Sequence, residues 1–118
     1  MGTEVVITLD CDGTVWLGNP PGPVTLDLIR KWVGKGYKVI MISDSINCQS
    51  ITQYGVPRNP KPWGKRHEAI NELMRENPNA VVYYIDDDQT RKTICNEVAD
   101  PSRCRFITPH DASSYQFP

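Results

Sequence analysis

Three short apolar runs rich in β-branched residues, at residues 5–9, 39–42 and 81–85, are each followed at once by polar residues. Each run is too short for a buried helix and shows no alternation of polar and apolar residues. That pattern is typical of strands buried on both faces, as in a parallel sheet. The segments between them predict helices, because apolar residues at positions 28, 29, 32 and 33, and again at 70, 73 and 74, recur at helical spacing. Strands alternating with helices predict an α/β fold with a central parallel sheet.

The expected ends of the helices and strands are set by prolines, glycines and helix-capping residues. We expect helices over about 24–34, 63–77 and 90–99, a short helix ending at Tyr54, and a short strand over 105–107. Residues 56–62 are punctuated by prolines and should be extended, and residues from 109 should form a tail. The length of 118 residues predicts a single domain over 1–118. The expected architecture is a three-layer α/β sandwich.

Composition narrows the class of protein. The chain is 39% hydrophobic and has a formal net charge of −1, which is typical of a globular domain without general attraction to nucleic acid or membranes. No apolar run is long enough to cross a bilayer, and the first residues lack a signal-peptide pattern. The four cysteines form no CxxC pair. We therefore expect reduced thiols at Cys11, Cys48, Cys95 and Cys104, and a location in the cytoplasm.

Acidic and hydroxyl side chains stand where the predicted strands end. Asp10 and Asp12 follow the first strand, Ser43 follows the second, and Asp86 and Asp87 follow the strand over 81–85. Parallel strands bring their carboxyl ends to one edge of the sheet, so these groups should converge there. Carboxylates held this close repel each other by roughly 1 to 4 kcal/mol per pair, which calls for a compensating cation. Oxygen ligands favour Mg²⁺.

Such a cluster suits phosphoryl transfer. Asp10 can attack the phosphorus and form an aspartyl phosphate, while Asp12 can protonate the leaving group and later activate water. The two acids are two residues apart because adjacent strand residues point to opposite faces. A lysine at 61 or 65 can neutralise the phosphate, and Lys65, Arg66, Arg91 and Lys92 near the site edge could hold a nucleic-acid backbone.

At these positions the sequence resembles the haloacid dehalogenase superfamily of phosphohydrolases. Residues 10–15, DCDGTV, match its first motif, and Ser43 after an apolar strand matches its second. Lys61, with Lys65 as the alternative, matches the lysine of the third motif, and Asp86-Asp87 after residues 81–85 match the acids of the fourth. The resemblance covers about residues 4–108, and the Asp-Asp form of the fourth motif most resembles the phosphatase domains of polynucleotide kinases.

The resemblance implies roles for these residues. Asp10 would be the nucleophile and a ligand of Mg²⁺, and Asp12 the acid and base, with its backbone carbonyl also on the metal. Asp87 would bind the metal directly and Asp86 through water. Ser43 and Lys61 would bind the phosphoryl oxygens.

The motif spacing leaves no room for the cap domain that most members carry, because about 28 residues separate Thr14 from Ser43 and about 17 separate Ser43 from Lys61. An open site predicts a macromolecular phosphate as substrate, with a nucleic-acid 3′-phosphate favoured, unless a partner protein or a second copy supplies a lid. The alternatives are a small-molecule or nucleotide phosphatase and a non-catalytic binding protein on the same fold. A response-regulator receiver domain fits less well, because its acceptor Asp and its Lys-Pro pair come in a different order.

Overall fold

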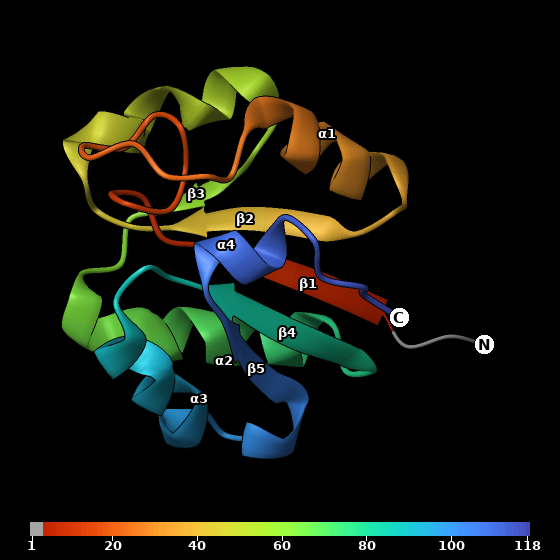
Figure 1. Cartoon of the computed structure of the whole chain (residues 1–118). Helices are drawn as coiled ribbons and strands as arrows, with labels where there is room; N and C mark the ends of the chain where they lie inside the picture. Colours follow the sequence, from red (N-terminus) through yellow and green to blue (C-terminus); the bar gives the residue numbers. More distant parts are fainter. Residues whose placement is uncertain (1–3) are drawn as a thin grey trace.

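The computed structural model describes residues 4–118, apart from the side chain of Trp63. Within these residues five strands form one sheet with the order β3-β2-β1-β4-β5, and every pair of neighbours is parallel (Figure 1). The predicted parallel α/β sheet is confirmed. The strands are β1 (Glu4–Leu9), β2 (Lys38–Ile42), β3 (Arg58–Asn59), β4 (Ala80–Ile85) and β5 (Cys104–Ile107).

Helices connect consecutive strands and cover both faces of the sheet. The α-helices are α1 (Leu26–Gly34), α2 (Arg66–Glu76), α3 (Ile94–Glu97) and α4 (Pro109–Ala112). Four segments are 3-10 helices: η1 (Ile46–Tyr54), η2 (Trp63–Lys65), η3 (Gln89–Thr93) and η4 (Pro101–Arg103).

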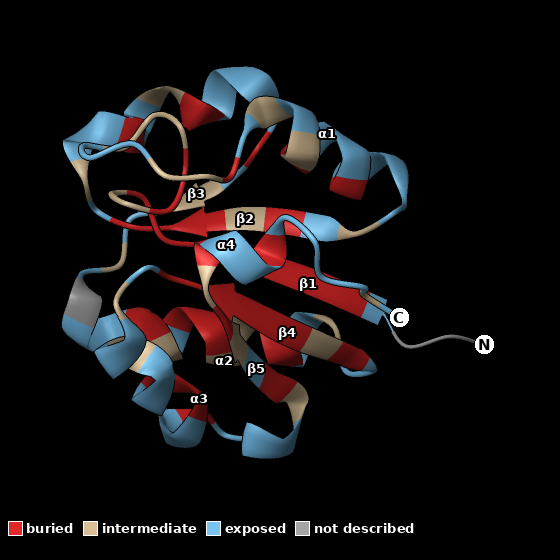
Figure 2. Cartoon of the chain, viewed as in Figure 1, coloured by how far each residue is buried: buried red, intermediate tan, exposed pale blue. Residues whose placement is uncertain are grey.

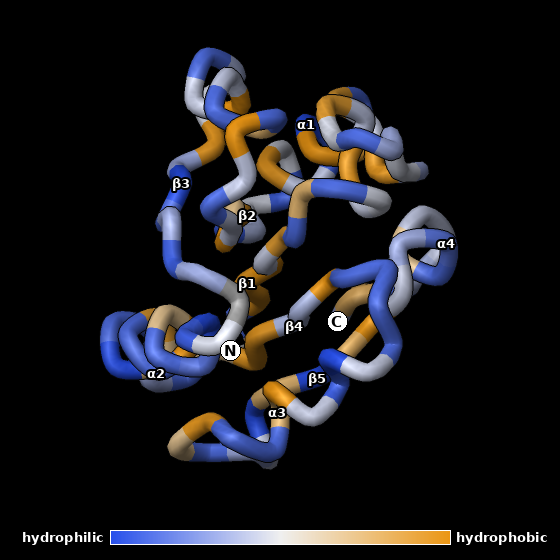
Figure 3. The backbone as a smooth tube through the Cα atoms, turned by 90° about the vertical axis from the view of Figure 1, so that its left-hand side faces the viewer, coloured by the Kyte–Doolittle hydropathy of each residue, from blue (hydrophilic) through white to orange (hydrophobic). Residues whose placement is uncertain are grey.

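Two hydrophobic cores lie on opposite faces of the sheet, which makes the fold a three-layer sandwich. One core joins the sheet to α1, η1 and α4, and includes Ile29, Trp32 and Ala112. The other joins it to α2 and α3, and includes Ile70 and Ile94. The buried residues follow the strands and the inward sides of the helices, while the outer helix surfaces are exposed (Figure 2). Hydrophobic residues are concentrated along the strands in the same way (Figure 3).

The strand register decides which residues meet at the edge of the sheet. Leu9 of β1 pairs with Met41 of β2 on one side and with Ile85 of β4 on the other. Asp10 and Asp86 therefore leave the sheet side by side, and Ser43 follows one step beyond on β2.

Three expectations need correction. The helix expected over 90–99 is divided into η3 and the short α3, and the segment ending at Tyr54 is a 3-10 helix. Residues from 109 do not form a loose tail: α4 packs on the sheet, and the Phe117 ring lies 5.8 Å from Trp32 and 4.9 Å from Tyr83 between ring centroids. Burial of these aromatic rings holds the end of the chain against the core.

Among the described residues, no helix has the length and apolar character needed to cross a membrane.

Candidate functional site at the carboxyl ends of the strands

A cavity of about 350 Å³ lies at the carboxyl ends of β1, β2 and β4. Four of the five sequence-predicted residues, Asp10, Asp12, Ser43 and Asp87, line it because each lies just beyond the end of its strand, and Asp86 is buried beside Asp10. The lining residues are Asp10, Asp12, Pro20, Ser43, Asp44, Ser45, Arg66, Asp87, Asp88 and Arg91. Polar and charged groups make up nearly all of this lining, so the cavity suits a charged ligand.

Asp10 lies buried at the base of the cavity with only 4% of its surface exposed. Its Oδ1 accepts a hydrogen bond from Arg66 Nη1 at 2.6 Å, and Arg91 Nη1 lies 3.4 Å from the same oxygen. The hydroxyl of Thr14 donates to Oδ2 at 3.3 Å. Burial raises the pKa of Asp10, and the neighbouring Asp86 raises it further, although both guanidinium groups oppose the shift.

Asp86 is completely buried beside Asp10. Its Oδ1 accepts the backbone N–H of Asp88 at 2.9 Å, and the hydroxyl of Tyr84 donates to its Oδ2. Arg66 Nη1 and Arg91 Nη1 also reach Oδ2, at 3.3 and 3.2 Å. Burial raises the pKa of Asp86 despite these donors. Both oxygens of Asp86 are thus already engaged by protein donors.

Asp10, Asp86 and Asp87 each offer a carboxylate oxygen, and these three oxygens lie within 4.8 Å of one another. Asp87 is the exposed member of the group. An all-oxygen donor set fits Mg²⁺, which binds through one or two carboxylates and retains several waters. Protein donors hold both oxygens of Asp10 and both oxygens of Asp86, so the exposed Asp87 is the acid of the three that is most open to a cation.

Gly13 allows Asp87 to approach the loop that follows β1. The backbone of Gly13 has a φ of +76°, and a Cβ atom at this position would lie 2.1 Å from Asp87 Oδ2. Any other residue would therefore be strained in its backbone and would displace the Asp87 carboxylate. The glycine of the D-x-D-G pattern is thus explained by the close approach of the Asp87 carboxylate to Gly13.

Asp12 also lines the cavity and is held there by three donors. The backbone N–H of Asn19 and the side-chain amide of Asn47 donate to Oδ1, both at 2.9 Å, and the hydroxyl of Ser45 donates to Oδ2 at 3.1 Å. Partial burial acts to raise the pKa of Asp12, but these hydrogen bonds outweigh it and the pKa is lowered. Asp12 is therefore fixed in position and favours its ionised form.

Ser43 is buried at the end of β2, with 2% of its surface exposed. Its Oγ accepts the backbone N–H of Ser45 at 3.1 Å, which is the short-range geometry of a turn-capping serine. The oxygen is the acceptor in this bond, so the hydroxyl of Ser43 can still act as a donor. Capping and ligand binding are thus compatible at this residue.

The two lysines expected at the site lie outside the cavity. Lys61 Nζ is 3.8 Å from Glu68 Oε1 in a partly exposed ion pair, and Lys65 is exposed. Arg66 instead reaches the acids, with 3% of its surface exposed, and it also donates to the hydroxyl of Tyr84 at 2.7 Å. The structure thus brings Asp10 and Asp86 together with Arg66 rather than with either lysine.

The phase of α2 carries the signal that identifies Arg66. Ala69, Ile70 and Leu73 are buried against the sheet, and they follow Arg66 at the i+3, i+4 and i+7 positions of one helical face. An arginine on the same helix face as these apolar residues points to the sheet. That residue is Arg66, the next one after the expected Lys65. The sequence alone places Arg66 only at the site edge, as a contact for a nucleic-acid backbone.

The cysteines also need correction. Cys11 and Cys48 form a disulfide, whereas Cys95 and Cys104 are free and buried. Cys11 stands between Asp10 and Asp12, and Cys48 belongs to η1, which begins next to Ser45 and includes Asn47. The bond therefore ties the loop after β1 to the segment that holds Asp12. It also leaves only Cys95 and Cys104 as free thiols, so the expectation of four reduced cysteines is wrong for Cys11 and Cys48.

We expect Arg66→Lys to lower the kcat/KM for a phosphate ester about 100-fold, if the cavity binds phosphate. A lysine is shorter, so its Nζ would fall short of the position from which Arg66 Nη1 contacts Asp10, Tyr84 and Asp86 together. Lys61→Met is the matched comparison and should cost less than about threefold, because a partly exposed ion pair contributes little. Steady-state kinetics on purified variants measures both. A larger loss in Lys61→Met than in Arg66→Lys would return the role to Lys61.

No protein-family model matches this chain, and no curated protein sequence matches it either.

Proposed function

We propose that this chain is a Mg²⁺-dependent phosphomonoesterase of the haloacid dehalogenase type that acts through an aspartyl phosphate. One observation carries the proposal. Asp10 lies buried in the lining of a polar cavity with its carboxylate 2.6 Å from a buried arginine, and Asp12, two residues on, lines the same cavity and is held there by three donors. A nucleophile and an acid–base group that line one cavity can act on the same phosphoryl group.

Each residue has a distinct part in the reaction. The Asp10 carboxylate attacks phosphorus, the bond to the leaving oxygen breaks, and Asp12 gives that oxygen a proton. Asp12, now ionised, takes a proton from water, the hydroxide attacks the acyl phosphate, and Asp10 is released with inorganic phosphate. Ser43 and Arg66 hold the phosphoryl oxygens. Asp10, Asp86 and Asp87 would hold Mg²⁺, which would supply positive charge to offset the developing negative charge.

The lowered pKa of Asp12 bears on this assignment. In the ligand-free chain Asp12 is ready as a base, which is its part in the second half of the reaction. A phosphate dianion entering the cavity brings negative charge close to Asp12 and raises its pKa, which favours the protonated form needed for the first half.

Substrate size follows from how open the cavity is. Within residues 4–118 the connection from β1 to α1 is a loop with a single bridge between Val15 and Val24, and the connection from β2 to α2 contains only η1, β3 and η2. Neither segment is a folded cap, so the end of a large phosphorylated molecule can enter. We propose a macromolecular phosphate, with the terminal phosphate of a nucleic acid favoured over a free nucleotide.

Chelation tests the metal requirement. We expect hydrolysis of p-nitrophenyl phosphate to fall at least about 100-fold with EDTA and to return when excess Mg²⁺ is added, because Asp10 and Asp86 would otherwise face an approaching dianion with only Arg66 and Arg91 to balance the charge. Excess Ca²⁺ is the matched control, since its larger radius and looser coordination should support little activity. Hydrolysis that persists in EDTA would exclude the metal-dependent mechanism.

A further inference from the structure

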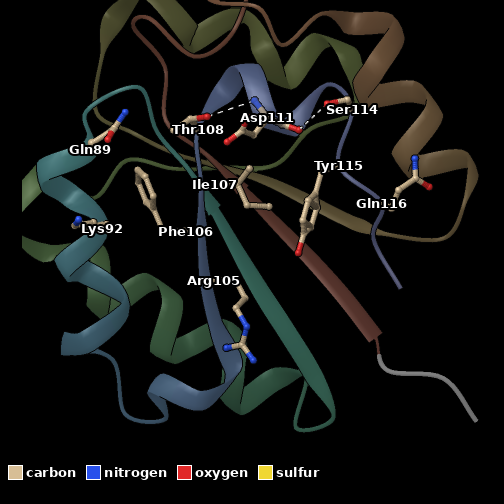
Figure 4. Close-up of a pocket in the computed structure, with 10 residues that line it drawn as sticks. All are labelled: Gln89, Lys92, Arg105, Phe106, Ile107, Thr108, Asp111, Ser114, Tyr115 and Gln116. Carbon is tan, nitrogen blue, oxygen red and sulfur yellow. Dashed lines mark hydrogen bonds between the residues drawn. The ribbon is translucent and has the colours of Figure 1, made fainter.

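A second cavity, of about 540 Å³, lies beside the edge strand β5 (Figure 4). Its floor is β5 together with the residue that follows it, one wall is η3, and the other is the C-terminal segment that follows α4. We call this cavity the β5 groove. Its volume is within the usual range for ligand sites, and nothing in the proposed phosphatase chemistry uses it.

The β5 groove adjoins the cavity that contains Asp10, with η3 between them. Asp88 and Arg91 line the Asp10 cavity, whereas Gln89 and Lys92 line the β5 groove. Neighbouring residues of the same short segment therefore face the two cavities. A chain whose end lies at Asp10 needs to pass only over η3 to enter the groove.

Two aromatic rings stand on either side of Ile107 in the β5 groove, Phe106 toward η3 and Tyr115 toward the C-terminus (Figure 4). Tyr115 is 41% exposed, yet its ring contacts Tyr83 at 5.6 Å and Phe117 at 4.8 Å between centroids. An aromatic residue that is held by neighbouring rings and remains partly exposed can offer a surface on which a planar group stacks.

Cationic and amide side chains accompany the rings. Lys92 and Arg105 are exposed, and Arg105 Nη1 donates to the carbonyl oxygens of Ser102 at 2.7 Å and Cys104 at 3.1 Å, which holds its guanidinium near the strand. Gln89 and Gln116 offer amides at opposite ends of the groove, and Asp111 is the one acid among the described lining residues. Stacking surfaces, cations and amides together suit bases joined by phosphates.

We propose that the β5 groove binds the strand of a single-stranded nucleic acid whose terminal phosphate lies in the Asp10 cavity. A base stacks on Tyr115, and Lys92 and Arg105 contact the backbone phosphates. This proposal rests on the proposed phosphatase function and adds to it the place where the substrate strand binds. An extended peptide pairing with the edge of β5 is the competing occupant, and the cations and the open ring favour nucleic acid.

Binding is measured first, separately from catalysis. A fluorescent single-stranded oligonucleotide without a terminal phosphate is titrated with the full chain at several salt concentrations, and the anisotropy gives Kd. We expect the Lys92→Glu/Arg105→Glu double variant to bind at least about tenfold more weakly, with a shallower dependence of log Kd on log salt. Tyr115→Ala should also weaken binding about tenfold through lost stacking.

The matched control reverses two charges on a remote surface. Arg30 on α1 and Arg75 on α2 are exposed and do not line the groove, and the Arg30→Glu/Arg75→Glu variant changes net charge by the same amount. It should bind the oligonucleotide as the wild type does, within about twofold. An equal loss in both double variants would mean that net charge alone attracts the oligonucleotide, and it would overturn the proposal.

Kinetics then separates this proposal from the phosphatase assignment. With 3′-phosphorylated oligonucleotides, the KM of the groove variants should rise at least about tenfold relative to their KM for p-nitrophenyl phosphate. If the wild type hydrolyses no phosphate ester but its oligonucleotide binding depends on Lys92 and Arg105, the phosphatase function fails and the groove stands. If it hydrolyses p-nitrophenyl phosphate but binds no oligonucleotide, the groove proposal fails, and peptide pairing at β5 becomes the better interpretation.

Discussion

Asp10→Asn is expected to lower kcat/KM for p-nitrophenyl phosphate by at least about 10³-fold, because an amide cannot form the aspartyl phosphate and a lost nucleophile is among the most costly changes an active site can undergo. The change keeps the shape of the side chain. Its carbonyl can still accept from Arg66 Nη1 at the position where Oδ1 now lies, 2.6 Å away. The loss should therefore be chemical rather than a failure to fold.

Folding and chemistry are separated by two measurements. The thermal unfolding midpoint of Asp10→Asn shows whether the chain remains folded, and Asp27→Asn, which changes an acid in the first turn of α1, controls for the loss of one negative charge. Acid-quenched wild type should carry a phosphoryl group on the peptide that contains Asp10, and the variant should carry none. A folded Asp10→Asn that keeps more than about a tenth of the activity would exclude Asp10 as the nucleophile.

The strands and the acids at their ends could be predicted from sequence because both depend on local features. A short β-branched run specifies a buried strand, and a parallel sheet brings the residues after each run to one edge. Asp10, Asp12, Ser43 and Asp87 line the predicted cavity for that reason, and Asp86 lies buried beside it. The position of the cavity and most of its lining could thus be predicted from where each strand ends in the sequence.

The cation could not be predicted in the same way. Which basic side chain points to the sheet depends on the residue at which α2 begins. The 3-10 helix η2 comes just before that residue and sets the orientation of the first turn of α2. Lys65 and Arg66 are adjacent, yet one is exposed and the other lies buried between two carboxylates. A step of one residue rotates a helical side chain by about 100°, so a small error in the start of the helix selects the wrong residue.

The C-terminal segment and the disulfide depend on contacts between distant parts of the chain. Phe117 packs on Trp32 and Tyr83, which lie far from it in sequence, and no local period announces that contact. Cys11 and Cys48 are 37 residues apart and become partners only when the loop after β1 meets η1. Spacing between cysteines does not reveal such a pair.

The disulfide leads to the second large effect. Removing it in the Cys11→Ala/Cys48→Ala double variant should lower the free energy of unfolding by about 4 kcal/mol, because a closed loop of this length restricts the unfolded chain. Both cysteines are fully buried, so the loss of packing adds to the effect. Urea denaturation without reductant measures the difference.

Reduction of the wild type provides the same comparison without a substitution. Dithiothreitol should shift the wild-type urea midpoint toward that of the double variant and leave the double variant unchanged, whereas Cys95→Ala, which removes a buried free thiol, should keep the full response to reductant. Catalysis should respond as well, since the bond joins the Asp10 loop to the segment whose Ser45 and Asn47 hold Asp12. Two results together would mean that Cys11 and Cys48 are not bonded: a wild-type midpoint that does not respond to reductant, and alkylation of both thiols after unfolding without reductant. The link between η1 and the Asp10 loop would then rest on the hydrogen bonds to Asp12 alone.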